Sequence, residues 1–278
     1  MLRSPRLRQR LGGLPPVRFA YRARLLAGSG EMIRARPREA WDYLLHSREI
    51  SNYTYELENE QEIAAWLSDA LGADAGAISS YLEELQGDEQ LLADLRAGLA
   101  SNARRDDEPR LGKRRAQYCV ARVERPQVIA ESGVHDGLGS SVLLRALERN
   151  ESEGSPGRLI GFDVNPDAGW LIDMECHRGR VELVYGDASL TLDRALARTG
   201  VDFFIHDSLR TLEHESFEYE TAIRHRRGRL VLYTDDASLT GAMRDLGRRE
   251  GIAPSIFTEV PKGHYWRGNE LGVLVLNI

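Results

Sequence analysis

The chain of 278 residues contains 42% hydrophobic and 29% charged residues and has a formal net charge of −6, values ordinary for a soluble globular protein. It has no apolar run near the roughly 20 residues that a bilayer-spanning helix needs, and its arginine-rich start lacks the apolar segment of a secretory signal. These features argue against a membrane protein and predict a cytoplasmic address. The two cysteines lack metal-ligand spacing, and we assign them no function.

Charge is distributed unevenly along the first hundred residues. Residues 1–50 contain eleven arginines and four acids, whereas residues 51–100 contain eleven acids and one arginine. A basic arm of this kind could bind nucleic acid, but it lacks the interleaved aromatic residues and glycines of RNA-binding segments. We therefore expect the two segments to neutralise each other, within one chain or across a homodimer or higher homo-oligomer, and regard nucleic acid as an unlikely partner.

Three regions are expected along the chain. Residues 1–36 are expected to form a basic N-terminal arm whose start can be mobile. Residues 37–110 carry apolar side chains at helical spacing, which predicts a helical region that covers a pocket or forms a dimer contact. Residues 111–278 change to another pattern and are expected to form the catalytic domain.

That last region alternates short β-branched apolar runs with helical stretches. The runs lie at residues 127–131, 158–163, 181–187, 201–207 and 229–236. Such alternation predicts a parallel sheet with helices on both faces, and two final apolar runs without a helix between them predict an antiparallel hairpin. The expected fold class is therefore α/β and Rossmann-like, with ligands bound beyond the carboxyl ends of the strands.

A glycine-rich loop follows the first expected strand and precedes a helix. Its pattern is E-x-G-x-x-x-G, from Glu131 through Gly133 to Gly137. Glycines let backbone amides approach a ligand at a helix N-terminus, but the acid would repel the pyrophosphate of a dinucleotide. An acid suits an ammonium group, and the helix amides suit a carboxylate. The loop resembles motif I of class I S-adenosylmethionine-dependent methyltransferases.

The resemblance continues at the next two strand ends. Asp163 stands where these enzymes place an acid for the ribose hydroxyls, and Asp187 stands where they place the residue that meets the adenine. Either aspartate alone could instead cap a helix. The resemblance implies the seven-stranded class I methyltransferase sheet and S-adenosylmethionine as cofactor. The cofactor-binding residues that it implies are Glu131, Gly133, His135, Gly137, Ser140, Asp163, Asp187, Ala188 and Asp207.

Three carboxylates are expected at the tips of the fourth and fifth strands, from Asp207, Asp235 and Asp236. Neighbouring anions need a cation or a proton between them, and oxygen ligands suit Mg²⁺ or a similar divalent ion. The arrangement resembles the metal-dependent O-methyltransferases of the catechol type, with Asp236 in place of their asparagine. The alternative is that Asp236 caps the next helix and Asp207 only orients substrate.

The stretch HDSLRTLEHESFEYE resembles bacterial sugar and natural-product O-methyltransferases of the macrocin type. If it turns helical, Asp207, Arg210 and His214 share one face. His214 is then the candidate general base, with His206 and His135 as alternatives, or it is only a solvated histidine. Arg210 stays protonated and could bind an anionic group of the substrate. The candidate substrate contacts near the last hairpin are His264 and Trp266, which could equally pack on the sheet.

These resemblances imply methyl transfer to a hydroxyl of a small molecule, a natural product or a sugar, assisted by a divalent metal. Two alternatives stay open: a metal-independent N- or carboxyl-methyltransferase, and a non-catalytic protein that binds S-adenosylmethionine or serves in assembly. RNA methylation is disfavoured because no Asn-Pro-Pro-Tyr-type motif follows the fourth strand. The sequence does not identify the acceptor.

Overall fold

The computed structural model of the chain describes residues 15–47, 54–102 and 105–277. The chain divides into two compact units. The first, called the helical unit, comprises Met1–Glu60, Asp88–Gly112 and Glu259–Gly268; the second, called the sheet unit, comprises Gln61–Gly87, Lys113–Thr258 and Asn269–Ile278. This division differs from the regions expected from the sequence, because residues 61–87 belong to the sheet unit and residues 259–268 belong to the helical unit.

Seven strands form one sheet in the order β3-β2-β1-β4-β5-β7-β6. They are β1 (Val128–Ser132), β2 (Arg158–Asp163), β3 (Val181–Tyr185), β4 (Val201–His206), β5 (Arg226–Thr234), β6 (Ser255–Thr258) and β7 (Glu270–Leu276). Neighbouring strands are parallel except β7, which runs antiparallel to both β5 and β6. The predicted α/β class, with its antiparallel C-terminal hairpin, is confirmed.

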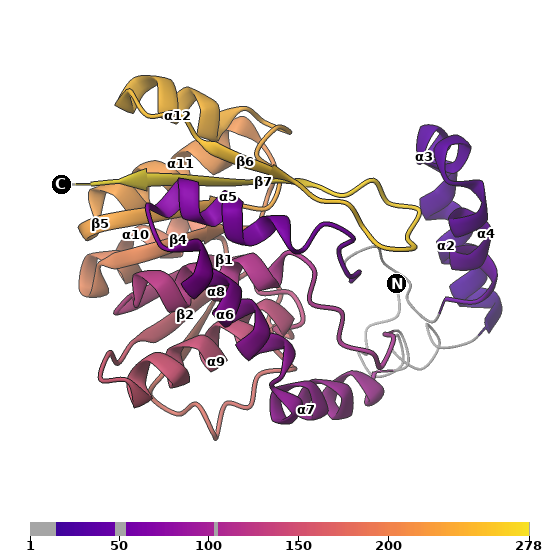
Figure 1. Cartoon of the computed structure of the whole chain (residues 1–278), viewed down its shortest axis with the longest axis horizontal. Helices are drawn as coiled ribbons and strands as arrows, with labels where there is room; N and C mark the ends of the chain where they lie inside the picture. The colour runs from indigo at the N-terminus through magenta and orange to yellow at the C-terminus, as the bar shows by residue number, and fades with distance from the viewer. Residues whose placement is uncertain (1–14, 48–53, 103–104, 278) are drawn as a thin grey trace. The chain divides into compact units, whose positions relative to one another are not determined.

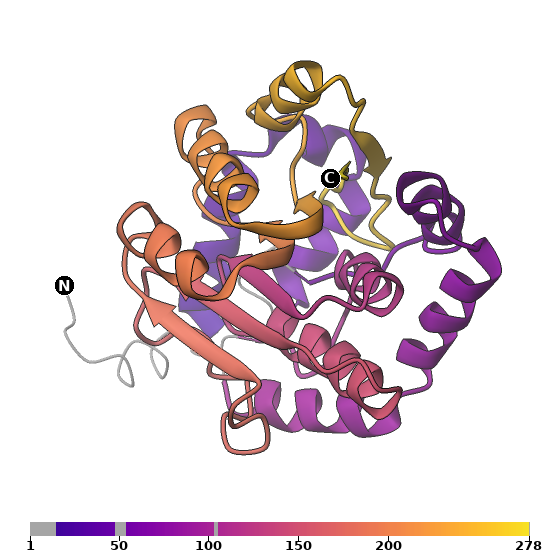
Figure 2. The ribbon, with the colours of Figure 1, turned by 90° about the vertical axis from the view of Figure 1, so that its left-hand side faces the viewer.

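Helices cover both faces of this sheet, as the alternating pattern predicts (Figure 1, Figure 2). They are α5 (Glu62–Leu71), α6 (Ala75–Gln86), α8 (Arg114–Glu124), α9 (Leu138–Ser152), α10 (Ala188–Thr199), α11 (Leu212–Arg224) and α12 (Ala242–Glu250). Leu196 of α10, Tyr219 of α11 and Leu246 of α12 share one buried core with the strands. Figure 2 shows these three helices on one side of the sheet and α8 and α9 on the other.

A buried arginine explains why residues 61–87 belong to the sheet unit. The side chain of Arg122, on α8, is 2% exposed, and its Nε lies 2.8 Å from Glu84 on α6. Its Nη2 lies 2.6 Å from Glu153 at the end of α9, and its guanidinium lies over the ring of Tyr81 at 4.6 Å. A buried guanidinium is stable only when such partners surround it. Arg122 therefore joins α6 to α8 and α9.

The helical unit consists of α2 (Pro15–Ala27), α3 (Gly30–Ala35), α4 (Pro37–Leu45), α7 (Glu89–Ala100) and the loop of residues 259–268. Much of the expected N-terminal arm is thus helical, and residues 1–14 lie outside the described residues. Leu57 forms a β-bridge with Pro261, and the ring of Tyr43 packs against that of Tyr265 at 4.6 Å. None of the helices in the described ranges is long and apolar enough to cross a membrane.

Candidate functional site

The central strands of the sheet end at one level, on the edge where open α/β sheets bind ligands. The ladder pairs Ser132 of β1 with His206 of β4, and His206 with Thr234 of β5. The residues that follow, Asp207 and Asp235, therefore leave the sheet side by side. The strand pairing thus brings together two of the three carboxylates expected from the sequence.

The glycine-rich loop joins β1 to α9 and runs close to the end of β4. Gly133 has a φ of 96°, and a Cβ at this position would lie 2.1 Å from the carbonyl oxygen of Asp207. Gly139, in the first turn of α9, would place a Cβ 2.8 Å from Oε1 of Glu131. The loop therefore has no space for side chains at these points, and the first turn of α9 offers backbone N–H groups to a carboxylate ligand.

Two buried oxygen acceptors lie beside this loop. The Glu131 side chain accepts a hydrogen bond from the Ser140 hydroxyl, and burial raises the pKa of Glu131 to about 7 although that hydrogen bond opposes the rise. Oε1 of Gln117, on α8, is buried without a hydrogen-bond partner among the described residues, and it lies 3.6 Å from a Cβ built on Gly139. A ligand that donates hydrogen bonds, such as an ammonium group, fits this pair of acceptors.

The other predicted cofactor residues hold the neighbouring loops in place. The carboxylate of Asp163 accepts hydrogen bonds from the backbone N–H groups of His135 and Asn165, each at 2.8 Å. Asp187 is the N-cap of α10 and accepts from the N–H of Ser189 at 2.9 Å, so it does cap a helix, the alternative considered for it. Ala188 begins that helix. Contact of these residues with a cofactor stays a prediction.

Two cations lie between the carboxylates at the strand tips. Nζ of Lys113 lies 2.6 Å from Oδ2 of Asp207 and 2.6 Å from Oδ1 of Asp235. The guanidinium of Arg210 lies 2.6 Å from Oδ2 of Asp235 and 3.3 Å from Oδ1 of Asp207. The pair is therefore charge-balanced by the protein itself, which differs from the expected trio of Asp207, Asp235 and Asp236 around an ion.

Burial and the neighbouring charges shift the pKa values of the groups in this cluster. Burial and the neighbouring Asp235 raise the pKa of Asp207 to about 6, against the opposing effect of Lys113. Burial alone would also raise the pKa of Asp235, but Lys113 and Arg210 outweigh burial and lower this pKa. Burial lowers the pKa of the Lys113 ammonium, yet the two aspartates outweigh burial and raise it. At neutral pH both cations are therefore charged.

This donor set does not fit a divalent ion, since the carboxylate oxygens that would be its ligands already contact Lys113 and Arg210. Among the described residues, three potential ligand atoms gather within 4.8 Å only at Glu148, Cys176 and His177. These residues are not at the strand tips, and Glu148 already pairs there with Arg145.

The predicted base His214 belongs to a hydrogen-bond network around Glu218. Its Nε2 lies 2.9 Å from Oε1 of Glu218, and that hydrogen bond raises the pKa of His214 although burial opposes the rise. Nδ1 of His206 lies 2.6 Å from Oε2 of the same carboxylate, and the Ser132 hydroxyl donates to it at 2.5 Å. His214 is thus held as a partner of Glu218, and His206 is buried beneath the site.

Three residues of this site were not predicted from the sequence. Lys113 directly precedes α8 and Gln117 follows it by four residues, so the two side chains lie on the same side of the start of this helix. The only signal for Lys113 was its rarity, as one of two lysines in the chain. Glu218 follows His214 by four residues, a spacing that places the two side chains together on a helix but is common on surfaces as well.

Exposed apolar side chains gather on the same edge of the sheet unit. The large hydrophobic residues of this unit that are exposed are Val164, Trp170, Met174, Tyr185, Leu190, Leu209, Leu212 and Leu239. All of them lie at the ends of β2 to β5 or in the segments that follow these strands. Exposed apolar side chains near the carboxyl ends of the strands are typical of ligand-binding surfaces.

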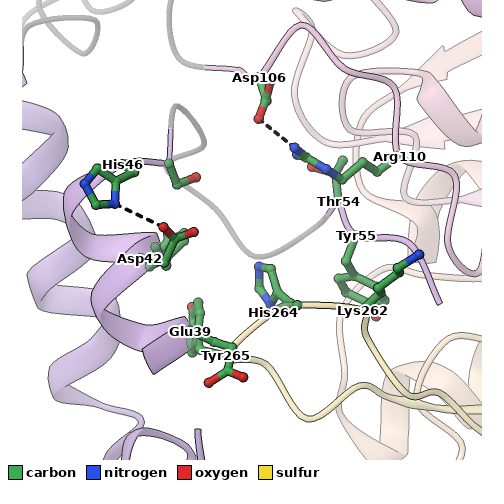
Figure 3. A pocket seen from close by; sticks show the side chains of 13 residues that line it. Glu39, Asp42, His46, Thr54, Tyr55, Asp106, Arg110, Lys262, His264 and Tyr265 are labelled. Carbon is green, nitrogen blue, oxygen red and sulfur yellow. Dashed lines mark hydrogen bonds and ion pairs between the residues drawn. The ribbon is translucent and has the colours of Figure 1, made fainter. Parts of the chain in front are cut away.

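The helical unit has a pocket of its own, with a volume of about 400 Å³ (Figure 3). Of the two predicted substrate contacts, His264 lines it and Trp266 does not. The imidazole of His264 stacks on Tyr265 with centroids 4.9 Å apart, and burial lowers its pKa to about 4. Asp42 and Asp106 also line the pocket. These acids pair with His46 and Arg110, which line the same pocket, and substrate binding by His264 and Trp266 stays a prediction.

Comparison with known proteins gives one family match, to a model described as a methyltransferase domain, over residues 130–237. No curated protein matches the chain. Among solved structures, the O-methyltransferase TomG from Streptomyces achromogenes, in complex with SAM and involved in tomaymycin synthesis, is 18% identical with a TM-score of 0.47; the match covers 78% of this chain and 98% of that one.

Two further solved structures are similar to the chain. The O-methyltransferase from Bacillus cereus in complex with SAH is 15% identical with a TM-score of 0.44, and the match covers 77% of this chain and 97% of that one. The MycE methyltransferase of mycinamycin biosynthesis, in complex with Mg and SAH, is 20% identical with a TM-score of 0.31 over 39% of this chain. The match spans about a quarter of MycE, 27% of its length.

Proposed function

We propose that this chain, whose residues 130–237 match the model of a methyltransferase domain, transfers a methyl group from S-adenosylmethionine to a hydroxyl group of a small molecule. The observation that carries the proposal is the pair of buried acceptors, Glu131 and Gln117, beside a glycine loop at the carboxyl edge of the sheet. The amino-acid end of S-adenosylmethionine supplies an ammonium group for these acceptors and a carboxylate for the start of α9.

The strand tips support an acceptor with a hydroxyl group. Arg210 has a third of its side chain exposed, at 33%, so its guanidinium can meet an anionic oxygen while it also pairs with Asp235. The apolar side chains that follow β4, Leu209 and Leu212, suit the carbon skeleton of a small molecule. The divalent ion expected from the sequence is not part of this proposal.

The reaction needs alignment and the removal of one proton. S-adenosylmethionine carries an activated methyl group, which passes in line from the sulfonium to the acceptor oxygen while the sulfur leaves as a neutral thioether. Asp207, with its pKa of about 6 and a partly exposed carboxylate, is ionised at neutral pH and can accept the hydroxyl proton. His214 is less suited, because Glu218 holds it and raises its pKa.

Incubation of the full chain with methyl-labelled S-adenosylmethionine and a panel of hydroxylated small molecules tests the proposal. We expect the label on an acceptor oxygen, and we expect Asp207→Asn to lower kcat by about 100-fold or more because the proton acceptor is lost. Label found on nitrogen or on a carboxylate would favour the alternative of an N- or carboxyl-methyltransferase. Cofactor binding without turnover of any acceptor would contradict the proposal and favour a non-catalytic binding protein.

A further inference from the structure

The proposed function gives no role to Lys113, which lies at the strand tips. Lys113 directly precedes α8, and its side chain is only 8% exposed. Its ammonium group lies 2.6 Å from an oxygen of Asp207 and 2.6 Å from an oxygen of Asp235. A lysine reaches a buried position of this kind at a considerable desolvation cost, which only close anionic partners offset.

The cluster leaves no carboxylate oxygen of Asp207 or Asp235 free for a divalent ion. All four carboxylate oxygens of Asp207 and Asp235 lie within 3.3 Å of a nitrogen of Lys113 or Arg210. The amide of Asn269 also donates to Oδ2 of Asp235 at 3.3 Å. A magnesium ion takes its oxygen ligands at about 2.1 Å, so an ion shared by both carboxylates would have to displace the lysine.

We propose that Lys113 occupies the place of a divalent ion at the strand tips and serves as the permanent cation of the site, so that methyl transfer proceeds without metal. Lys113 acts as a positioning residue: it holds Asp207 and Asp235 together and keeps the local charge balanced, while Arg210 stays exposed toward the acceptor. The inference has two halves. The catalytic half, that methyl transfer proceeds without metal, rests on the proposed function. The ion-binding half, that Lys113 fills the place of a divalent ion, does not.

The ion-binding half predicts that removal of the lysine creates a metal site. Lys113→Met leaves Asp207 and Asp235 buried and close together with one cation fewer, an arrangement that a hard divalent ion stabilises. Titration of Mn²⁺ into the full chain, followed by electron paramagnetic resonance, should show at least about tenfold tighter binding to this variant than to the wild type. Adding Asp235→Asn to the variant should abolish that binding.

Matched variants keep this test decisive. Lys262→Met removes the only other lysine of the chain, which is exposed and outside the cluster, and should leave Mn²⁺ binding at the wild-type level. Lys113→Gln keeps a hydrogen-bond donor without the charge, and it replaces Lys113→Met if that variant does not fold. Equal Mn²⁺ affinity of the wild type and the folded Lys113 variant would overturn the inference.

A second readout addresses the catalytic half. Wild-type turnover should be unchanged by EDTA, whereas Lys113→Met should lose turnover and recover part of it when Mn²⁺ is added, because the ion restores the missing charge. Loss of wild-type turnover in EDTA would contradict a metal-free reaction. If no acceptor is methylated at all, the proposed function fails, but the Mn²⁺ titration still decides whether Lys113 fills the cation position.

Discussion

Gly133→Ala is expected to destabilise the sheet unit by roughly 3–5 kcal/mol and to abolish cofactor binding. Gly133 has a φ of 96°, a conformation that alanine adopts only with strain. A Cβ there would also lie 2.1 Å from the carbonyl oxygen of Asp207 and 2.6 Å from its carbonyl carbon. Both atoms belong to the backbone at the tip of β4, so relief of the clash must move the glycine loop or the strand end. Urea unfolding at fixed pH measures the loss.

Gly154→Ala is the matched control for this prediction. Gly154 also has a positive φ, of 86°, but nothing lies within 4 Å of a Cβ built on it. Its substitution should therefore cost only the backbone strain, about 1 kcal/mol. Equal losses for the two variants would mean that the loop does not pass against β4 as described.

Glu218→Ala is expected to have an effect of similar size, a loss of about 3–5 kcal/mol in the free energy of unfolding. The carboxylate of Glu218 is fully buried and accepts from Ser132 at 2.5 Å, Ser208 at 3.0 Å and His214 at 2.9 Å, and it pairs with His206 at 2.6 Å. Its removal leaves these donors, of which Ser132 and His206 are buried, without their acceptor, and that is more costly than the loss of the bonds alone. Chemical denaturation measures the change.

The effect of Glu218 should depend on pH in a defined direction. Burial alone would raise its pKa, but the hydrogen bonds from His206 and His214 outweigh burial and lower the pKa from 4.5 to about 2. A carboxylate with a depressed pKa stabilises the fold above its unfolded value, and this stabilisation is lost as the pH falls from about 4.5 toward 2. The difference in the free energy of unfolding between the wild type and Glu218→Ala should therefore shrink in that window.

Glu220→Ala is the control for Glu218→Ala. Glu220 is exposed and pairs with Arg249, so its substitution should cost at most about 1 kcal/mol. An equally small cost for Glu218→Ala would contradict the network.

The sheet and the ends of its strands could be predicted from sequence because they depend on local pattern. The alternation of apolar runs and helical stretches fixed the parallel core and the closing hairpin, and the E-x-G-x-x-x-G loop indicated the methyltransferase domain that the family match confirms. Asp207 and Asp235 were predicted to lie together because parallel strands end at one edge. These predictions need only the order of elements and the register of a sheet.

The partner that Asp207 and Asp235 share, Lys113, could not be predicted, because it comes from a distant part of the chain. Lys113 lies 94 residues before Asp207 and directly precedes α8. Glu218 meets His214 through their four-residue spacing on α11, whereas its contact with His206 of β4 depends on tertiary packing. The loop of residues 259–268 follows a strand, yet it packs with Tyr43 of α4.

Calorimetric titration of the wild-type chain with S-adenosylmethionine tests the central claim most directly. The account predicts saturable binding of one cofactor per chain and release of a proton near pH 7, because an ammonium group beside Glu131 lowers a pKa that burial has raised to about 7. Buffers with different heats of ionisation reveal that proton, and Glu131→Gln should remove it. Folded protein that shows no saturable heat of binding would contradict the account.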